Sequence, residues 1–304
     1  MLPLHLSLIF DALQAQAPIS MNKETHLLQS QFLKRTVTVD VYLPPANGPL
    51  HLLLINDGQN LAEMHFENIL SALLESGQMQ PLMCVGIHAG DDRRNEYATA
   101  NFMDYEGRGG AIAQAYQQFV LEELIPHIAI QYGIENFESK SFAGFSMGGL
   151  CAMDVVWNNP QQFSVAGVFS GSLWWRTKAL EDGYNEDTDR IMHRQVREGK
   201  YSEGLKFYFT TGSQDETADR NNNGRMDCCE NMQPGQRCCC EHGDDHAGQG
   251  HQEGPARIGH RLFRDQQRVD RRGDAHAGKR TLPVRFGPDA VILGYDVTVA
   301  AAAA

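Results

Sequence analysis

The stretch Gly144-Phe145-Ser146-Met147-Gly148 restricts the possible folds of this chain more than any other. It joins an apolar run typical of a strand, residues 141–145, to a run compatible with a helix, residues 150–157. G-x-S-x-G between a strand and a helix is the pattern of a nucleophile elbow, and its glycines leave room for the sharp turn. We therefore expect Ser146 to be a nucleophile and the Met147 N–H to face a developing oxyanion. Close packing of a strand on a helix is the structural alternative.

The totals set limits on the class of protein. With 304 residues the chain is long enough for one α/β domain of roughly 220 to 250 residues and an appendage. A net charge of -12 argues against nucleic-acid binding, which needs clustered Lys and Arg. No apolar run reaches the roughly 18 to 20 residues of a membrane span, so no membrane partner is expected.

The beginning of the chain is open to two interpretations. Residues 1–10 are apolar and residues 15–17 imitate a signal cleavage site, but no Lys or Arg precedes the run and Asp11 interrupts it. Met21 is an alternative start. We expect a cytoplasmic protein, with a periplasmic or secreted one as the alternative.

Apolar and alternating runs separated by amphipathic segments predict the fold class. Besides the strand before Ser146, strands are expected at residues 26–33, 36–43, 50–55, 82–87, 165–169 and 207–211. Helices are expected at residues 61–74 and 111–128 and directly after Ser146. This order predicts an α/β fold with a mostly parallel central sheet, helices on both faces and an antiparallel pair of strands at the N-terminus.

The chain changes character after about Met226. Residues 227–281 combine five cysteines and five histidines with no helical or strand periodicity, so they cannot bury a core of their own. Residues 283–299 are apolar again and predict one strand or hairpin. We divide the chain into an N-terminal extension (1–25), an α/β domain (26–227) and an atypical C-terminal segment (228–304). A reading-frame error and a genuine Cys/His insertion both explain that segment, and the coding DNA distinguishes them.

Several motifs occur in the order found in one known family. They are residues 35–45, Asp57-Gly58-Gln59-Asn60, Arg93-x-x-Glu96-Tyr97, residues 144–149 and residues 170–175. Over residues 26–227 the chain resembles the putative-esterase family, which includes esterase D, enterochelin esterases, feruloyl esterases and mycolyltransferases. The resemblance implies an α/β-hydrolase fold, a Ser–acid–His triad and a small-molecule ester as substrate.

A serine nucleophile needs a base and donors for the oxyanion. The resemblance assigns the second oxyanion N–H to Gln59, beside that of Met147, and the acid to Asp215, with Glu216 as the alternative. The family's histidine follows one more helix and strand, which this chain lacks. By its spacing from Asp215 we expect His260 to be the base, with His276 as the alternative.

Histidines outside the triad order and two motifs beside the elbow have simpler interpretations. His88 and His127 lie upstream and are expected to be ordinary loop and helix-end residues. Arg93, Glu96 and Tyr97 are expected to form an ion pair and packing group near the site, with substrate contact as the alternative. The neighbouring Trp174 and Trp175 are expected either to line an acyl or aromatic pocket or to pack in the core.

Residues 219–230 match the EF-hand pattern D-x-[DN]-x-[DN]-G-x(5)-E in full. We expect a structural Ca²⁺ there, with a polar turn as the alternative; no cofactor is expected for catalysis. The expected ligands are Asp219, Asn221, Asn223, Arg225 through its carbonyl, Asp227 and Glu230. Zinc is not expected at the following cysteines, because adjacent cysteines are poorly spaced as tetrahedral ligands.

The sequence thus predicts a serine carboxylic-ester hydrolase that works through an acyl-enzyme on Ser146. Two alternatives stay open. One is an acyltransferase of the same fold, and the other is a catalytically impaired hydrolase-fold protein without a proper triad histidine.

Overall fold

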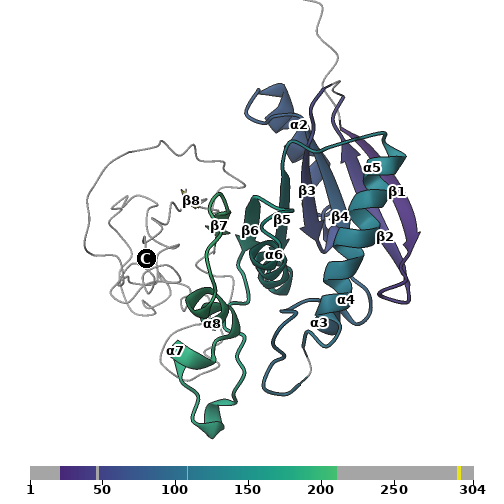
Figure 1. The fold of residues 1–304 in the computed structure, drawn as a ribbon. Helices are drawn as coiled ribbons and strands as arrows, with labels where there is room; N and C mark the ends of the chain where they lie inside the picture. Colours follow the sequence, from purple (N-terminus) through teal and green to yellow (C-terminus); the bar gives the residue numbers. More distant parts are fainter. Residues whose placement is uncertain (1–20, 46–47, 108, 211–292, 296–304) are drawn as a thin grey trace, which may run out of the picture.

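The computed structural model describes residues 21–45, 48–107, 109–210 and 293–295. They form one eight-stranded sheet of strand order β1-β2-β4-β3-β5-β6-β7-β8 (Figure 1). The central strands β4, β3, β5, β6 and β7 are parallel, whereas β1, β2 and β8 pair antiparallel with their neighbours. Their bounds are β1 (Asn22–Gln29), β2 (Thr36–Leu43), β3 (His51–Asn56), β4 (Leu82–Ile87), β5 (Lys140–Phe145), β6 (Val165–Phe169), β7 (Lys206–Thr210) and β8 (Leu293–Tyr295). The predicted fold class is confirmed, and β8 lies within the apolar segment 283–299.

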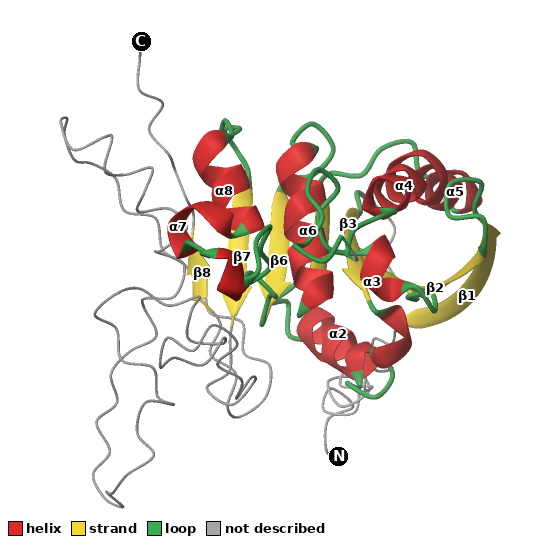
Figure 2. Ribbon diagram, turned by 90° about the horizontal axis from the view of Figure 1, so that it is seen from below, coloured by secondary structure: helices red, strands yellow, loops and turns green. Residues whose placement is uncertain are grey.

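Each face of the sheet has its own hydrophobic cluster, because successive side chains of a strand point to opposite faces. On β3, Leu52 and Leu54 belong to one cluster and Ile55 to the other. The first cluster includes residues of α4 (Ala113–Gln118), α5 (Ile125–Gln131), α6 (Met147–Asn158) and α8 (Ile191–Glu198). The second includes Leu70 of α2 (Phe66–Glu75), on the opposite face (Figure 2).

The predicted long helix at residues 111–128 is present with an altered hydrogen-bond pattern. Between α4 and α5 the backbone is π-helical over Phe119–Leu124. Pro126 stands in the first turn of α5. Proline cannot donate to the carbonyl four residues earlier and its ring clashes with it, so a widened turn is a physical accommodation of this proline.

Two predicted boundaries are wrong by several residues. The first strand spans Asn22–Gln29, not 26–33, because the hairpin register pairs Gln29 with Thr36 and leaves residues 30–35 for the connection. Helix α2 begins at Phe66, not at residue 61, because Gly58–Asn60 form a 3₁₀ turn and His65 has a φ of 52°. The short helices α3 (Arg93–Glu96) and α7 (Glu186–Asp189), the 3₁₀ turn Leu180–Asp182 and α8 were not predicted.

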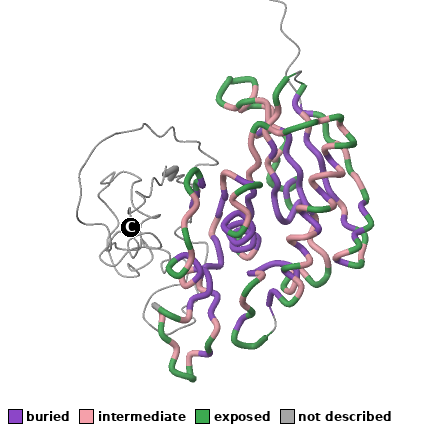
Figure 3. Tube along the Cα trace, viewed as in Figure 1, coloured by how far each residue is buried: buried purple, intermediate pink, exposed green. Residues whose placement is uncertain are grey.

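A buried carboxylate ties α6 to three other parts of the chain. Asp154 is 1% exposed and accepts hydrogen bonds from the Ala100 N–H (2.8 Å), Gln117 (2.8 Å), Asn158 (2.9 Å) and Gln195 (2.9 Å). Burial raises its pKa to about 6, and these hydrogen bonds limit the rise. Helix α6 is buried along most of its length (Figure 3), so Asp154 anchors three segments on the helix that follows Ser146.

Among the helices in the described part of the chain, none is both long enough and apolar enough to cross a membrane.

Candidate active site

Ser146 alone connects β5 to α6. Its φ of 51° and ψ of -120° are rarely adopted by a residue with a side chain, and such a conformation costs on the order of 1–3 kcal/mol. Its N–H donates to Phe169 O (2.9 Å), and its carbonyl accepts from the N–H groups of Gly149 (3.0 Å), Leu150 (3.1 Å) and Ser172 (3.1 Å). These contacts on both sides hold the backbone in its strained conformation.

The glycines around Ser146 are required by close backbone contacts. A Cβ on Gly144 would lie 2.4 Å from the carbonyl carbon of Gly148, and a Cβ on Gly149 would lie 2.8 Å from Gly144 O. Real Cβ atoms do not approach backbone atoms so closely. The prediction that this turn requires small residues is confirmed. Glycine is needed both for the turn itself and for the close packing of β5 on α6.

The Ser146 side chain is exposed and contacts a second serine. Its Oγ lies 3.0 Å from the Oγ of Ser172, which is 5% exposed and follows β6. No histidine or carboxylate within the described ranges forms a hydrogen bond with Ser146. Ser172 lies within a family motif but had no predicted role; its position at the end of the strand next to β5 was the available signal.

The loop that carries Gln59 packs against the N-terminus of α6. Asp57 has a φ of 61° and precedes the 3₁₀ turn Gly58–Asn60. Asn56 donates to Gly148 O (2.8 Å), and a Cβ on Gly148 would lie 2.8 Å from Asp57 Oδ2. The N–H groups of Gln59 and Met147, which were predicted to face the oxyanion, have no acceptor among the residues that the structure describes. Two unused donors therefore belong to segments in direct contact.

An ion pair holds this loop. Arg93 binds both carboxylate oxygens of Asp57, at 2.6 and 2.7 Å, and its guanidinium lies 5.0 Å from the centre of the Tyr97 ring. The hydrogen bonds to Asp57 raise the pKa of Arg93, and the Asp57 N–H donates to the Tyr97 hydroxyl (3.1 Å). Glu96, 2% exposed, pairs with Arg35 at 2.5 and 2.6 Å. These contacts support the structural interpretation of Arg93, Glu96 and Tyr97.

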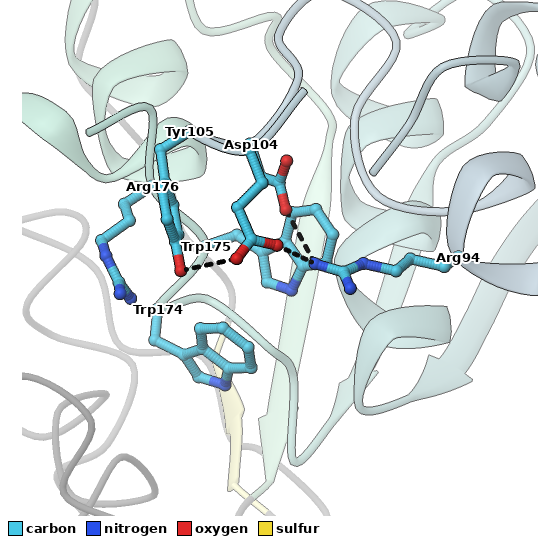
Figure 4. Close-up of a pocket in the computed structure, with 7 residues that line it drawn as sticks. Arg94, Asp104, Tyr105, Trp174, Trp175 and Arg176 are labelled. Atoms are coloured by element: carbon cyan, nitrogen blue, oxygen red, sulfur yellow. Dashed lines mark hydrogen bonds and ion pairs between the residues drawn. The ribbon is translucent and has the colours of Figure 1, made fainter. Parts of the chain in front are cut away.

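Trp174 and Trp175 line a pocket of about 310 Å³ (Figure 4). The other lining residues are Arg94, Asp104, Tyr105, Glu106 and Arg176. Trp175 is 4% exposed and belongs to the core, whereas Trp174 is half-buried and packs against the core. Thus Trp175 is both a pocket wall and a core residue, and the substrate-binding role expected of this pair stays a prediction.

The upstream histidines are engaged away from Ser146. His88 Nε2 lies 2.9 Å from Asp40 Oδ2. His127 packs against His26, with 5.9 Å between ring centres, and burial followed by the proximity of His26 lowers its pKa. Neither forms a hydrogen bond with Ser146 in the described structure, which agrees with their expected ordinary roles.

The remaining predicted residues lie outside the described residues. These are the acid Asp215 and the base His260, with the alternatives Glu216 and His276, and the six expected calcium ligands in residues 219–230. The strand expected to precede the acid is present as β7, which ends at Thr210. Their roles therefore stay predictions.

Two solved structures resemble this chain. The siderophore hydrolase EstB from Aspergillus nidulans superposes with a TM-score of 0.50 and 17% identity, covering 64% of this chain and 71% of its own. The enterochelin esterase from Shigella flexneri has a TM-score of 0.49 and 24% identity, covering 63% of this chain and 45% of its own. At this identity, the first likeness shows a common fold and nothing about the reaction.

Two sequence comparisons also found related proteins. The uncharacterized protein YbbA of Bacillus subtilis (strain 168) is 26% identical over 147 residues, which is 46% of this chain and 58% of that protein. The chain therefore spans little more than half the length of this curated relative. The family model described as Putative esterase matches residues 30–252, which is more than half of the chain. The chain thus belongs to the Putative esterase family.

Proposed function

We propose that this protein hydrolyses carboxylic esters through an acyl-enzyme on Ser146. One observation carries the proposal: the exposed Ser146 hydroxyl stands at a strained strand-to-helix turn, beside two segments whose Met147 and Gln59 N–H groups lack acceptors among the described residues. These features support a nucleophile elbow with an oxyanion hole. Membership of an esterase family supports the same chemistry.

The steps follow from these groups. Ser146 Oγ attacks the ester carbonyl while a histidine, predicted to be His260 oriented by Asp215, accepts its proton. The Met147 and Gln59 N–H groups stabilise the oxyanion, and each such donor contributes about 3–4 kcal/mol. The intermediate collapses, the C–O bond to the alcohol breaks, and the imidazolium protonates the leaving alcohol. Water then attacks the acyl-enzyme in the same way and releases the acid.

Labelling of the full chain with a fluorophosphonate probe tests the nucleophile. We expect one probe per protein by intact mass, and no labelling of Ser146→Ala. Ser76→Ala is the matched control, because Ser76 is an exposed serine whose hydroxyl donates to Leu73 O at the end of α2. Folded protein that takes up no probe would contradict the proposal and favour an impaired hydrolase.

The fate of the acyl group distinguishes hydrolysis from acyl transfer. With a 4-nitrophenyl ester as donor, we expect the free acid as the product even when a simple alcohol is added. Formation of the alcohol's ester as the main product would instead identify an acyltransferase that uses the same acyl-enzyme.

A further inference from the structure

The pocket lined by Trp174 and Trp175 contains a buried cation that has no partner among the described residues. Arg176 is 9% exposed and lines the pocket. Its Nε is fully covered, and within the described ranges the guanidinium has no hydrogen-bond acceptor and no ion-pair partner. Burying a charge without a partner is costly, and proteins normally pair such a group. The missing anion is therefore the feature of the pocket that needs an explanation.

The carboxylates around Arg176 are already bound to other cations. Arg94 pairs with Asp104 (2.9 Å) and Glu106 (3.3 Å), and it lies across the pocket from Arg176 (Figure 4). Outside the pocket, Arg190 pairs with Glu186 (3.2 Å), and Lys178 lies 3.9 Å from Asp189. Among the described residues, Arg176 thus has no ion-pair partner of its own, although the pocket lining as a whole holds two arginines and two carboxylates.

Two aromatic rings lie near the Arg176 guanidinium. Its centre lies 4.8 Å from the ring centre of Tyr105 and 5.7 Å from that of Tyr184. These rings offer the guanidinium no carboxylate, and its Nε is covered, so the terminal N–H groups are the ones left for an anion. A carboxylate can accept two such hydrogen bonds in a planar, bidentate pair. Trp174 adds a flat apolar wall beside this position.

The chain connects one wall of the pocket to the surroundings of Ser146. Trp174 follows Ser172 by two residues, which span at most about 7 Å, and Ser172 Oγ is 3.0 Å from Ser146 Oγ. We propose that this pocket is an anion subsite in which Arg176 binds a carboxylate of the ester substrate while Trp174 packs against the linker. The substrate class is then the half-esters of dicarboxylic acids. This proposal rests on the proposed esterase function.

A pair of matched substrates tests the subsite. For the full chain we expect a higher kcat/KM for 4-nitrophenyl hydrogen glutarate than for the neutral 4-nitrophenyl butyrate. Arg176→Gln should lower the ratio of the two values about 10- to 100-fold, the usual effect of losing a charged hydrogen bond. Arg194→Gln is the control, because Arg194 is exposed, pairs with Glu198 and lies 5.4 Å from the Phe102 ring. Equal kcat/KM values for the two esters in the unmodified protein would overturn the proposal.

Binding without turnover separates this proposal from the proposed function. In Ser146→Ala, monomethyl glutarate should change the fluorescence of Trp174 and Trp175, and methyl butyrate should not. Adding Arg176→Gln should abolish the change, whereas Arg176→Lys, which keeps the charge, should keep part of it even if Arg176→Gln does not fold. If the protein hydrolyses neither ester but still gives the fluorescence response, the subsite is supported and the proposed esterase function is not. The absence of any response to monomethyl glutarate would refute the subsite.

Discussion

Exchange of Arg93 for methionine tests whether the Asp57 ion pair positions the oxyanion donor. The substitution keeps an apolar stem and removes both hydrogen bonds to Asp57, which lie at 2.6 and 2.7 Å. Leaving a buried charge unpaired costs about 3–5 kcal/mol. The Asp57 side chain is 6% exposed but that of Arg93 is 35% exposed, and solvent screening therefore reduces the expected loss below that range, to about 2 kcal/mol.

Arg93→Met should lower kcat by more than its loss of stability alone would cause. The Gln59 N–H follows Asp57 by two residues, and the φ of 61° at Asp57 sets the direction of the 3₁₀ turn. Loss of one oxyanion donor lowers kcat about 100- to 1,000-fold. Since the loop keeps its contact between Asn56 and Gly148 O, we expect a partial loss, about 100-fold in kcat with a smaller change in KM.

Ester hydrolysis under saturating and limiting substrate, together with urea unfolding, measures both effects. Arg35→Met is the matched control, because Arg35 forms a similar two-bond pair with the buried Glu96. It should lower the free energy of unfolding with a smaller effect on kcat. In the double variant Arg93→Met/Asp57→Asn no charge is left unpaired and asparagine tolerates the positive φ, so most of the lost stability should return. A wild-type kcat in folded Arg93→Met protein would refute the reasoning.

Three further predictions concern the elbow and α6. Gly144→Ala should lower the free energy of unfolding by about 3 kcal/mol, because its Cβ meets backbone 2.4 Å away; near-normal urea stability would contradict this. Ser172→Ala should lower kcat/KM about 5- to 10-fold by removing one hydrogen bond to Ser146 Oγ, and an unchanged value would exclude a role for Ser172. Folding raises the Asp154 pKa from 3.8 to about 6. Asp154 therefore makes its full contribution to the free energy of unfolding below pH 3.8. This contribution, about 3 kcal/mol in total, is lost as the pH rises to about 6. The unfolding free energy of wild type minus that of Asp154→Asn should therefore fall between pH 4 and 7, and a constant difference would contradict the shift.

Strands were predictable because a buried parallel strand is apolar throughout and ends abruptly. The expected bounds of β4 and β6 coincide with the observed Leu82–Ile87 and Val165–Phe169. Helix α8 was missed although its buried residues are Ile191, Met192, Gln195 and Val196. Polar side chains separate them, and the buried Gln195 is accounted for only by its tertiary hydrogen bond to Asp154. Tertiary contacts of this kind are not visible in the local pattern.

The candidate site was predictable where the backbone dictates the residue. Gly144 and Gly148 mark the turn because no larger residue fits, so the position of Ser146 at this turn could be predicted from the sequence. Arg176 could not, because its significance lies in the absence of a partner within the described structure. A sequence shows which charges are present and does not show which of them become paired.

Main-chain groups fasten the pocket-forming segment between α3 and α4 to its neighbours. Asp154 accepts the Ala100 N–H, and the Tyr105 N–H donates to Arg176 O at 3.0 Å. Both donors are main-chain groups, which every residue except proline supplies. Exposed side chains along residues 101–107, such as that of Met103, can thus diverge while the segment stays attached to the helix that follows Ser146, whereas the buried Asp104 is held by its ion pair with Arg94. Such an arrangement lets evolution, or a laboratory library, explore new substrate preferences with little risk to the serine turn.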